Sequence, residues 1–149
     1  MSITIEEQVR TEIEALHDFF VGWFTGALKT SSFDSGFLAR FDPDFLLIPP
    51  AGIILSLAEL SSGIKNTYDT NPDFRIAIRN VEIQRVLDNE IIATYEEWQR
   101  NAINSKPPDN ARAASVLFSP KSTNSPFQWL HIHETWLPAT DTPSERFDF

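Results

Sequence analysis

Two adjacent runs of sequence, FRIAIRNVEIQRVL (residues 74–87) and EIIATYEEWQRN (90–101), set the fold class of this chain. In both runs, branched and aromatic residues alternate with polar ones, which is the period of two expected of β-strands. Asp88-Asn89 between them supplies a tight turn, so the pair predicts a β-hairpin. The runs 111–119 and 127–137 show the same alternation and are separated by a loop at 120–126. The second half therefore predicts four long strands in sequence.

The first half has helical periodicity instead. Apolar residues recur at steps of three and four along its start, at Ile5, Val9, Ile13, Leu16, Phe20, Phe24 and Ala27. Thr4-Ile-Glu-Glu7 and Ser56-Leu-Ala-Glu59 both fit the capping box that opens a helix. A short helix at 34–40 and two short strands, one at 44–49 and one after Ala51-Gly52, complete the order.

Helices that precede a meander of strands favour an α+β fold: a curved, mostly antiparallel sheet packed on N-terminal helices, with an internal pocket. A length of 149 residues suits one domain, 1–149, with its core at about 5–138. The tail, 139–149, is expected to be frayed, although Phe147 and Phe149 could dock.

Composition excludes several classes of function. The net charge of −9 disfavours nucleic acid and anionic membranes as partners. The chain has no cysteine, no apolar run long enough to span a membrane and no signal-peptide pattern, so we expect a cytoplasmic protein. A Gly-x-Ser-x-Gly elbow and a phosphate-binding glycine loop are both missing from the sequence.

The alternation shows which residues share a face of the sheet. Ile92, Thr94, Glu96 and Trp98 share one face of their strand, and Leu130, Ile132, Glu134 and Trp136 share one face of the last strand. Both faces of both strands mix apolar bulk with polar groups. We interpret this mixture as partial burial of both faces, which predicts a homodimer.

The order of elements resembles the nuclear transport factor 2-like superfamily, which includes SnoaL-like cyclases, ketosteroid isomerases and the association domain of calcium/calmodulin-dependent kinase. WLHIHETW (129–136) looks like a frequent ending of these domains, with Thr135 standing where a second His is usual, and IATYEEW (92–98) is similar to their mid-sheet strand. The resemblance implies a cone-shaped sheet around a pocket. It places Tyr95, Glu97, His131 and His133 on the face of the sheet opposite to this pocket, at a subunit contact.

On this resemblance the pocket face carries Glu96, Trp98, Glu134 and Trp136, with space above Ala113 and Ser115. The first helix contains no Tyr, which argues against the chemistry of the ketosteroid isomerases, where a Tyr donates to the oxyanion.

Two carboxylates in one apolar cavity raise each other's pKa, so Glu96 and Glu134 are the candidate catalytic acid and base. The candidate ligand-binding residues are Trp23, Thr94, Trp98, Ser115 and Trp136. The alternative interpretation makes the glutamates structural ion-pair partners of Arg79, Arg100 or Arg112, and the tryptophans core residues.

His131 and His133 could supply two metal ligands. A zinc site also needs a third ligand from a neighbouring strand, and the spacing of residues does not require one there. We therefore favour histidines at a subunit interface and expect no metal. His17 is expected at the boundary of the first helix's apolar stripe. The resulting hypothesis is a domain that binds a small apolar or mixed-polarity ligand and could act on it as a cofactor-independent isomerase, dehydratase or cyclase that uses a carboxylate acid or base. The alternative is a non-catalytic module for oligomerisation or for binding a protein partner.

Overall fold

The computed structural model describes residues 3–120 and 127–149; most of the expected loop at 120–126 lies outside the described residues. The α-helices are α1 (Ile5–Thr25), α2 (Phe33–Gly36) and α3 (Leu57–Lys65). The strands are β1 (Phe41–Ile48), β2 (Leu55–Ser56), β3 (Arg75–Val86), β4 (Ile91–Arg100), β5 (Asn110–Pro120) and β6 (Phe127–Trp136). Short 3₁₀ turns lie at Thr30–Ser32, Leu38–Arg40, Ala139–Asp141 and Ser144–Arg146. The predicted α+β class is confirmed.

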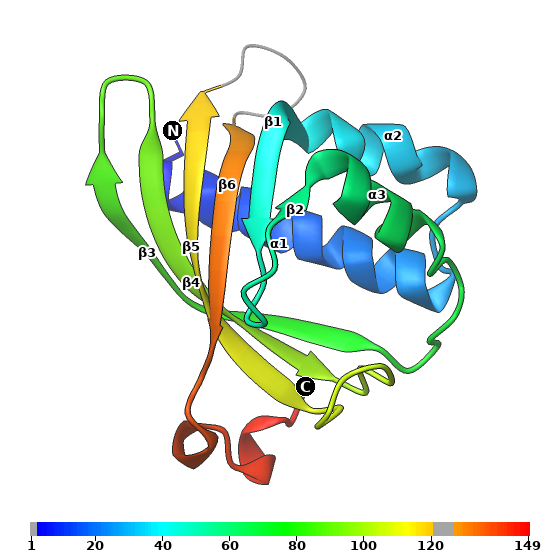
Figure 1. The fold of residues 1–149 in the computed structure, drawn as a ribbon. Coiled ribbons are helices and arrows are strands. Elements are labelled where there is room, and N and C mark those ends of the chain that lie inside the picture. The colour runs from blue at the N-terminus through cyan, green and yellow to red at the C-terminus, as the bar shows by residue number, and fades with distance from the viewer. Residues whose placement is uncertain (1–2, 121–126) are drawn as a thin grey trace.

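The six strands form one curved sheet in the order β2-β1-β6-β5-β4-β3 (Figure 1). The predicted meander is confirmed, because β3, β4, β5 and β6 pair antiparallel with their neighbours in sequence. β1 and β6 pair in parallel, which joins the helical first half of the chain to the end of the meander. The sheet is therefore mostly antiparallel, as expected.

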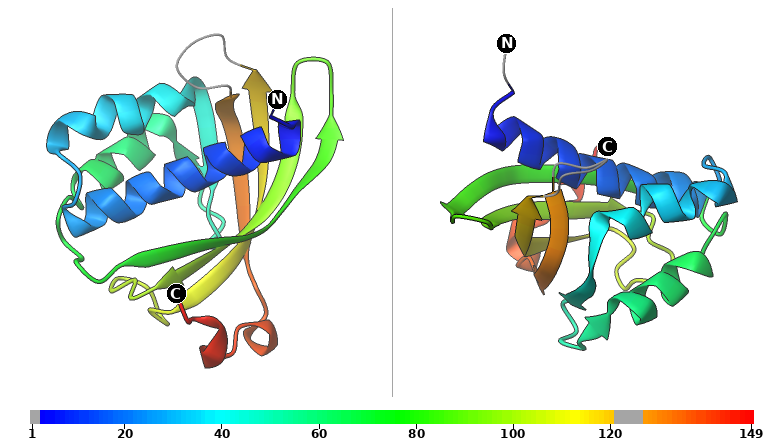
Figure 2. Two further views of the ribbon diagram at one scale, coloured as in Figure 1. Left: turned by 180° about the vertical axis from the view of Figure 1, so that it is seen from behind. Right: turned by 90° about the horizontal axis from the view of Figure 1, so that it is seen from above.

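Helix α1 lies across one face of this sheet (Figure 2). The Thr4 hydroxyl accepts a hydrogen bond from the N–H of Glu7 at 3.2 Å, which caps the first turn. Gly26 ends the helix in the left-handed conformation, with φ at 79°, where glycine avoids the steric cost of a Cβ. The apolar stripe of α1 is buried against the sheet. We call the covered side of the sheet the inner face and the opposite side the outer face.

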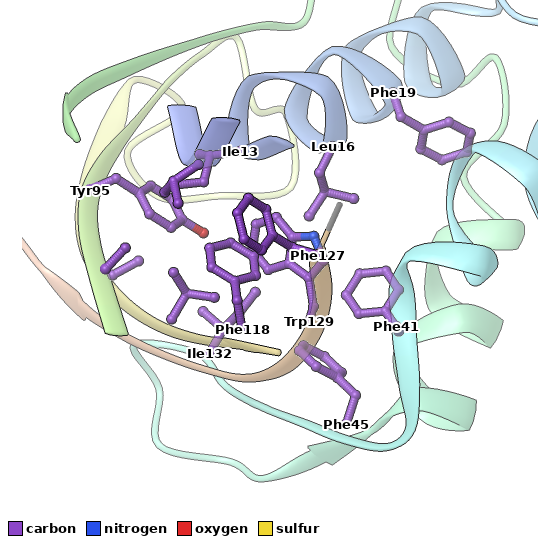
Figure 3. Packing of buried hydrophobic residues seen from close by; sticks show 14 of the residues in the cluster. Ile13, Leu16, Phe19, Phe41, Phe45, Tyr95, Phe118, Phe127, Trp129 and Ile132 are labelled. Atoms are coloured by element: carbon purple, nitrogen blue, oxygen red, sulfur yellow. The ribbon is translucent and has the colours of Figure 1, made fainter. Parts of the chain in front are cut away.

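Aromatic rings fill the space between α1 and the inner face (Figure 3). The rings of Phe118 and Trp129 meet edge-on with centroids 4.6 Å apart. One carboxylate lies within this core: Glu12 accepts hydrogen bonds from Arg40 at 2.6 Å and from the Trp129 indole at 2.9 Å. Because its acceptors are used in this way, the buried carboxylate links α1 to β6 without leaving a bare charge.

The C-terminal tail is folded onto the outer face, so the expected fraying is wrong and the docking of Phe147 is confirmed. Phe147 packs on Trp98 with ring centroids 5.1 Å apart. The guanidinium groups of Arg79 and Arg146 each lie 4.5 Å from the Trp98 ring. The tail thus covers the outer face of β3, β4 and β5 around Trp98, and we call residues 139–149 the tail strap. None of the helices among the described residues has the length and apolar character to cross a membrane.

Candidate functional site

The sheet register separates the two predicted catalytic glutamates. Glu134 lies in line with Tyr95 across the sheet, through Ala114, whereas Glu96 lies in line with Thr135. Residues aligned in this way point to the same face. Tyr95 and Glu134 are on the inner face, and Glu96 is on the outer face, so the two glutamate side chains point to opposite sides of the sheet, although both residues border one open hollow of about 490 Å³.

The inner face holds a polar cluster beneath α1, formed by His17, Tyr95, Glu97, Arg112 and Glu134, which we call the inner polar cluster. Its shortest ion pair joins Nε2 of His17 to Oε1 of Glu97 at 3.0 Å. The other imidazole nitrogen of His17 lies 2.7 Å from the carbonyl oxygen of Ile13, one helical turn earlier. With both ring nitrogens facing oxygen acceptors, the imidazolium form is favoured.

Burial opposes charge on both members of this pair, but their attraction outweighs it. For His17, burial lowers the pKa. The Glu97 carboxylate and the hydrogen bonds raise it by more than burial lowers it, so the net shift is upward. For Glu97, burial raises the pKa, but His17, Arg112 and the Gln99 amide together bring it down to about 2. The pair is therefore charged at neutral pH.

Glu134 behaves in the opposite way. Burial and the neighbouring Glu97 carboxylate raise its pKa to about 7, although Arg112 and His17 act against this rise. The ion pair with Arg112 is long, at 3.4 Å between Nη1 and Oε1. The alternative interpretation of Glu134 as an arginine partner is thus partly realised. Its raised pKa nonetheless leaves it able to gain or lose a proton near neutral pH.

Two buried polar atoms of the cluster have no hydrogen-bond partner within the described residues: the Tyr95 hydroxyl and Nε of Arg112. Arg112 does use Nη2, which donates to the side-chain oxygen of Asn110 at 3.2 Å. The Tyr95 hydroxyl points into the interior (Figure 3). Unsatisfied buried polar groups are costly and uncommon in native proteins, so each of these two atoms needs a partner such as an ordered water or a ligand group.

The cluster reaches the surface at Trp136. The Arg112 guanidinium lies 4.9 Å from the ring of Trp136, which is 49% exposed. An open hollow of about 260 Å³, here called the end hollow, is lined by Trp136, Asn110 and Lys106, together with Pro107, Asp109, Ala111, Leu137, Ala139 and Thr142. Trp136 thus adjoins both Arg112 and the end hollow, which is also lined by a second cation, Lys106.

The other predicted site residues lie elsewhere. Trp23 is buried in the core and donates to the carbonyl of Ile64 at 2.8 Å, and Trp98 is covered by the tail strap. Thr94 and Ser115 line an open hollow of about 490 Å³ over the outer face, the outer hollow. Glu96 lines it too, and it accepts from the Trp98 indole at 2.9 Å. The hollows described here open to the surface, so an enclosed internal pocket stays a prediction.

Of the predicted set, Glu134 belongs to the inner polar cluster and Trp136 lies beside it. His17, Glu97 and Arg112 were not predicted as site residues. A hint existed for His17, which lies one turn after Ile13 on the buried side of α1, where a charged residue needs a partner. His131 and His133 fall on the outer side, paired with Leu117 and Ser115. The described residues contain no group of three or more His, Asp or Glu side chains arranged to hold a metal ion.

No protein-family model matches this sequence, and no curated protein matches it significantly. Solved structures do match. An NTF2-like protein of unknown function from Pseudomonas aeruginosa is 23% identical, with a TM-score of 0.77 over 88% of this chain and 99% of that one. The chain has the NTF2-like fold. A Caulobacter vibrioides protein with a cystatin-like fold is 13% identical, with a TM-score of 0.62 over 95% of this chain and 93% of that one.

The NTF2-like fold also occurs in assembly domains. The CaMKII hub domain from S. rosetta is 11% identical to this chain, with a TM-score of 0.71, covering 92% of this chain and 100% of the hub. The resemblance inferred from the order of elements is therefore confirmed at the level of the fold. The NTF2-like fold is compatible with both ligand binding and oligomerisation, so the function must be argued from the side chains.

Proposed function

We propose that this chain binds a small aromatic carboxylic acid at the Arg112 end of the inner polar cluster, and that Glu134 exchanges a proton when the ligand binds. The observation that carries the proposal is the guanidinium of Arg112, which has a buried, unused Nε and lies against the half-exposed ring of Trp136. A guanidinium binds a carboxylate through two parallel N–H donors, and an indole provides a flat apolar surface for a ring.

The charges around Arg112 support an anionic ligand. Glu97 is already neutralised by His17, so it does not need Arg112 as its main partner. Glu134 is close to Arg112, but burial favours its neutral form. An incoming carboxylate can replace Glu134 as the anion facing Arg112, and Glu134 then takes up a proton. Lys106 lines the end hollow beside Trp136, where Asp109 offsets its charge, so the attraction for the anion rests on Arg112.

The same arrangement defines the chemistry that the site can perform. A carboxylate with its pKa near 7 can remove a proton from a bound substrate or return one, which isomerisation, dehydration and cyclisation all require. Arg112 holds the negative charge that such a step creates. Glu134 keeps its predicted role as acid or base, while Glu96 on the outer face takes no part in this step.

Calorimetric titration with benzoate tests the binding proposal, with benzamide as the neutral ligand of the same shape. We expect benzoate to bind more tightly than benzamide. Arg112→Gln should weaken benzoate at least tenfold, because the charged donor pair is lost. Arg79→Gln is the matched control, since Arg79 also lies over a tryptophan but on the outer face. Equal benzoate affinities for Arg112→Gln and the unmodified protein would refute the site.

The proton exchange has its own readout. Benzoate titrations at pH 7 in buffers of different ionisation enthalpy should reveal net proton uptake, and Glu134→Gln should remove that uptake while the protein still binds benzoate. Binding without any proton uptake in the unmodified protein contradicts the role of Glu134. In that case, binding at Arg112 remains supported by the first experiment alone.

The second candidate function is self-association through the outer face. The outer hollow is bordered by Glu82, Glu96, Thr94, Ser115 and His133, among others, and none of the described helices lies in front of this part of the sheet in Figure 1. In a symmetric dimer, acidic groups of one copy can face the histidine of the other, since each patch meets itself. The similarity to a CaMKII hub domain agrees with such an assembly.

Light scattering at micromolar concentration distinguishes the two states of association. We expect a dimer that His133→Asp converts to a monomer, because a third acid is added to a face with Glu82 and Glu96. Glu14→Gln, at an exposed position of α1 on the other side of the sheet, serves as a control that alters charge away from that face. A monomeric unmodified protein excludes this function and leaves the binding proposal intact.

A further inference from the structure

A third hollow, of about 160 Å³, shares no lining residue with the outer hollow or the end hollow; we call it the lateral hollow. It forms where the connection between α3 and β3 passes the loop after β4, at the right of Figure 1. The amide Nδ2 of Asn71 donates to the carbonyl of Asn101 at 2.7 Å, and Nδ2 of Asn101 donates to the carbonyl of Asp73 at 2.8 Å. These two bonds fix the walls relative to each other.

The hydrogen-bond donors around the lateral hollow are largely in use. The hydroxyl of Thr67 donates to Ile64 at 2.6 Å, and the hydroxyl of Thr70 donates to Thr67 at 2.6 Å. The amide Nε2 of Gln99 donates to Glu97 at 2.6 Å. Both hydroxyls keep oxygen lone pairs after donating, and the Gln99 amide keeps its oxygen acceptor beside one further N–H, so these three side chains offer more acceptors than remaining donors.

The apolar part of the lateral hollow is aromatic. Phe24 and Phe74 both line it, and their ring centroids are 5.1 Å apart. Asp69 and Asp73 lie exposed in the same connection, and the whole chain carries a net charge of −9. Aromatic faces, acceptor oxygens and negative potential together favour a cation that also carries N–H donors.

We propose that the lateral hollow binds a small organic ammonium ion, with its N–H groups on the oxygens of Thr70, Asn71 and Gln99 and its apolar body against Phe24 and Phe74. The volume accommodates a fragment-sized molecule rather than a larger metabolite. This site is separate from the acid-binding site at Arg112, and the two ligands carry opposite charge.

The test uses benzylamine, with benzyl alcohol as the neutral analogue of similar shape, added to ¹⁵N-labelled protein. We expect saturable shifts of backbone amides in residues 67–74 and 99–105, and at least fivefold weaker binding of benzyl alcohol. Thr70→Val removes an exposed acceptor and should weaken benzylamine at least threefold. Thr30→Val is the matched surface control, since Thr30 lies outside the hollow.

Ala102→Leu is a second variant, because the larger side chain occupies space in the hollow. It should abolish the benzylamine shifts, and retained benzoate binding at Arg112 would show that it is folded. Arg112→Gln should leave benzylamine binding unchanged. The proposal is overturned if benzylamine shifts map to other residues, if benzyl alcohol binds equally well, or if both Thr70→Val and Ala102→Leu bind benzylamine normally.

Discussion

Nε2 of His17 on helix α1 lies 3.0 Å from Oε1 of Glu97 on strand β4, and both side chains are buried. The two residues are 80 positions apart, so this ion pair exists only when α1 lies on the inner face. The ion pair therefore holds the helix against the sheet. It also supplies the fixed positive charge that allows Glu97 to remain ionised next to Glu134.

Removing one member of this pair should be far more costly than removing both. His17→Phe leaves a buried carboxylate without its cation and should lower the free energy of unfolding by about 3 kcal/mol. In the double variant His17→Phe/Glu97→Leu no buried charge is stranded, and much of that loss should be recovered. Urea unfolding of the unmodified protein, His17→Phe, Glu97→Leu and the double variant gives the double-mutant cycle. Strictly additive losses would show that the pair is not coupled.

Glu134 makes stability depend on pH with a definite sign. Its pKa is raised from 4.5 to about 7 in the folded protein, so between these values the folded state holds a proton that the unfolded chain releases. The free energy of unfolding therefore falls as pH rises from 4.5 to about 7, by on the order of 3 kcal/mol at most. Glu134→Gln should lack this fall and be the more stable protein at pH 8.

Thermal unfolding between pH 4.5 and pH 8 measures this difference. Glu96→Gln, on the outer face, is the matched control for the loss of one carboxylate. His17 titrates in part of the same range, since its raised pKa gives stability that is lost as pH rises through that value. Glu134 is one of the groups that raise the pKa of His17, so this contribution is smaller in Glu134→Gln than in the other two proteins. A Glu134→Gln variant with an unchanged pH profile would falsify the raised pKa.

The tail strap should contribute measurably to stability. Phe147 is buried against Trp98, so Phe147→Ala should cost about 3 kcal/mol of unfolding free energy. Phe149→Ala should cost less, because its ring is only half-buried and lies farther along the strap. Guanidinium denaturation compares the two. If Phe147→Ala were as stable as the unmodified protein, the strap would not be a packed element.

Two glycines should respond oppositely to alanine. At Gly26, φ is 79° and a Cβ would clash with the side chain of Asp69, so Gly26→Ala should destabilise by at least about 1 kcal/mol. Gly63 is exposed within α3 and a Cβ there meets nothing within 4 Å, so Gly63→Ala should stabilise by about 0.5–1 kcal/mol. Thermal unfolding checks both. Stabilisation by Gly26→Ala would contradict the left-handed helix end.

Local signals in the sequence predicted the elements well because each depends on nearby residues. Thr4 caps α1, and Ser56 and Glu59 form the expected reciprocal capping box of α3. The strands β3 to β6 begin and end within one residue of the predicted runs. Alternation correctly separated Glu96 from Glu97. It could not say which of the two faces α1, since a period of two is the same seen from either side.

The last strand shows a second physical limit. The register between β5 and β6 shifts between Leu117 and Phe118, which pair with His131 and Trp129. Trp129 therefore joins the inner core, although simple alternation predicted that it shares a face with His131. A bulge of one residue leaves little trace in the sequence. The inner polar cluster was missed for a related reason, because its members come from α1, β4, β5 and β6 and meet only in the folded chain.

The unequal burial of the four tryptophans has a practical consequence. Trp23, Trp98 and Trp129 are at most 2% exposed, whereas Trp136 is 49% exposed and adjoins Arg112. In the native protein, an aqueous collisional quencher such as iodide can reach Trp136 and is shielded from the other three indoles. The long-wavelength edge of the intrinsic emission therefore belongs to one side chain, and the protein carries its own optical probe at the mouth of the proposed site.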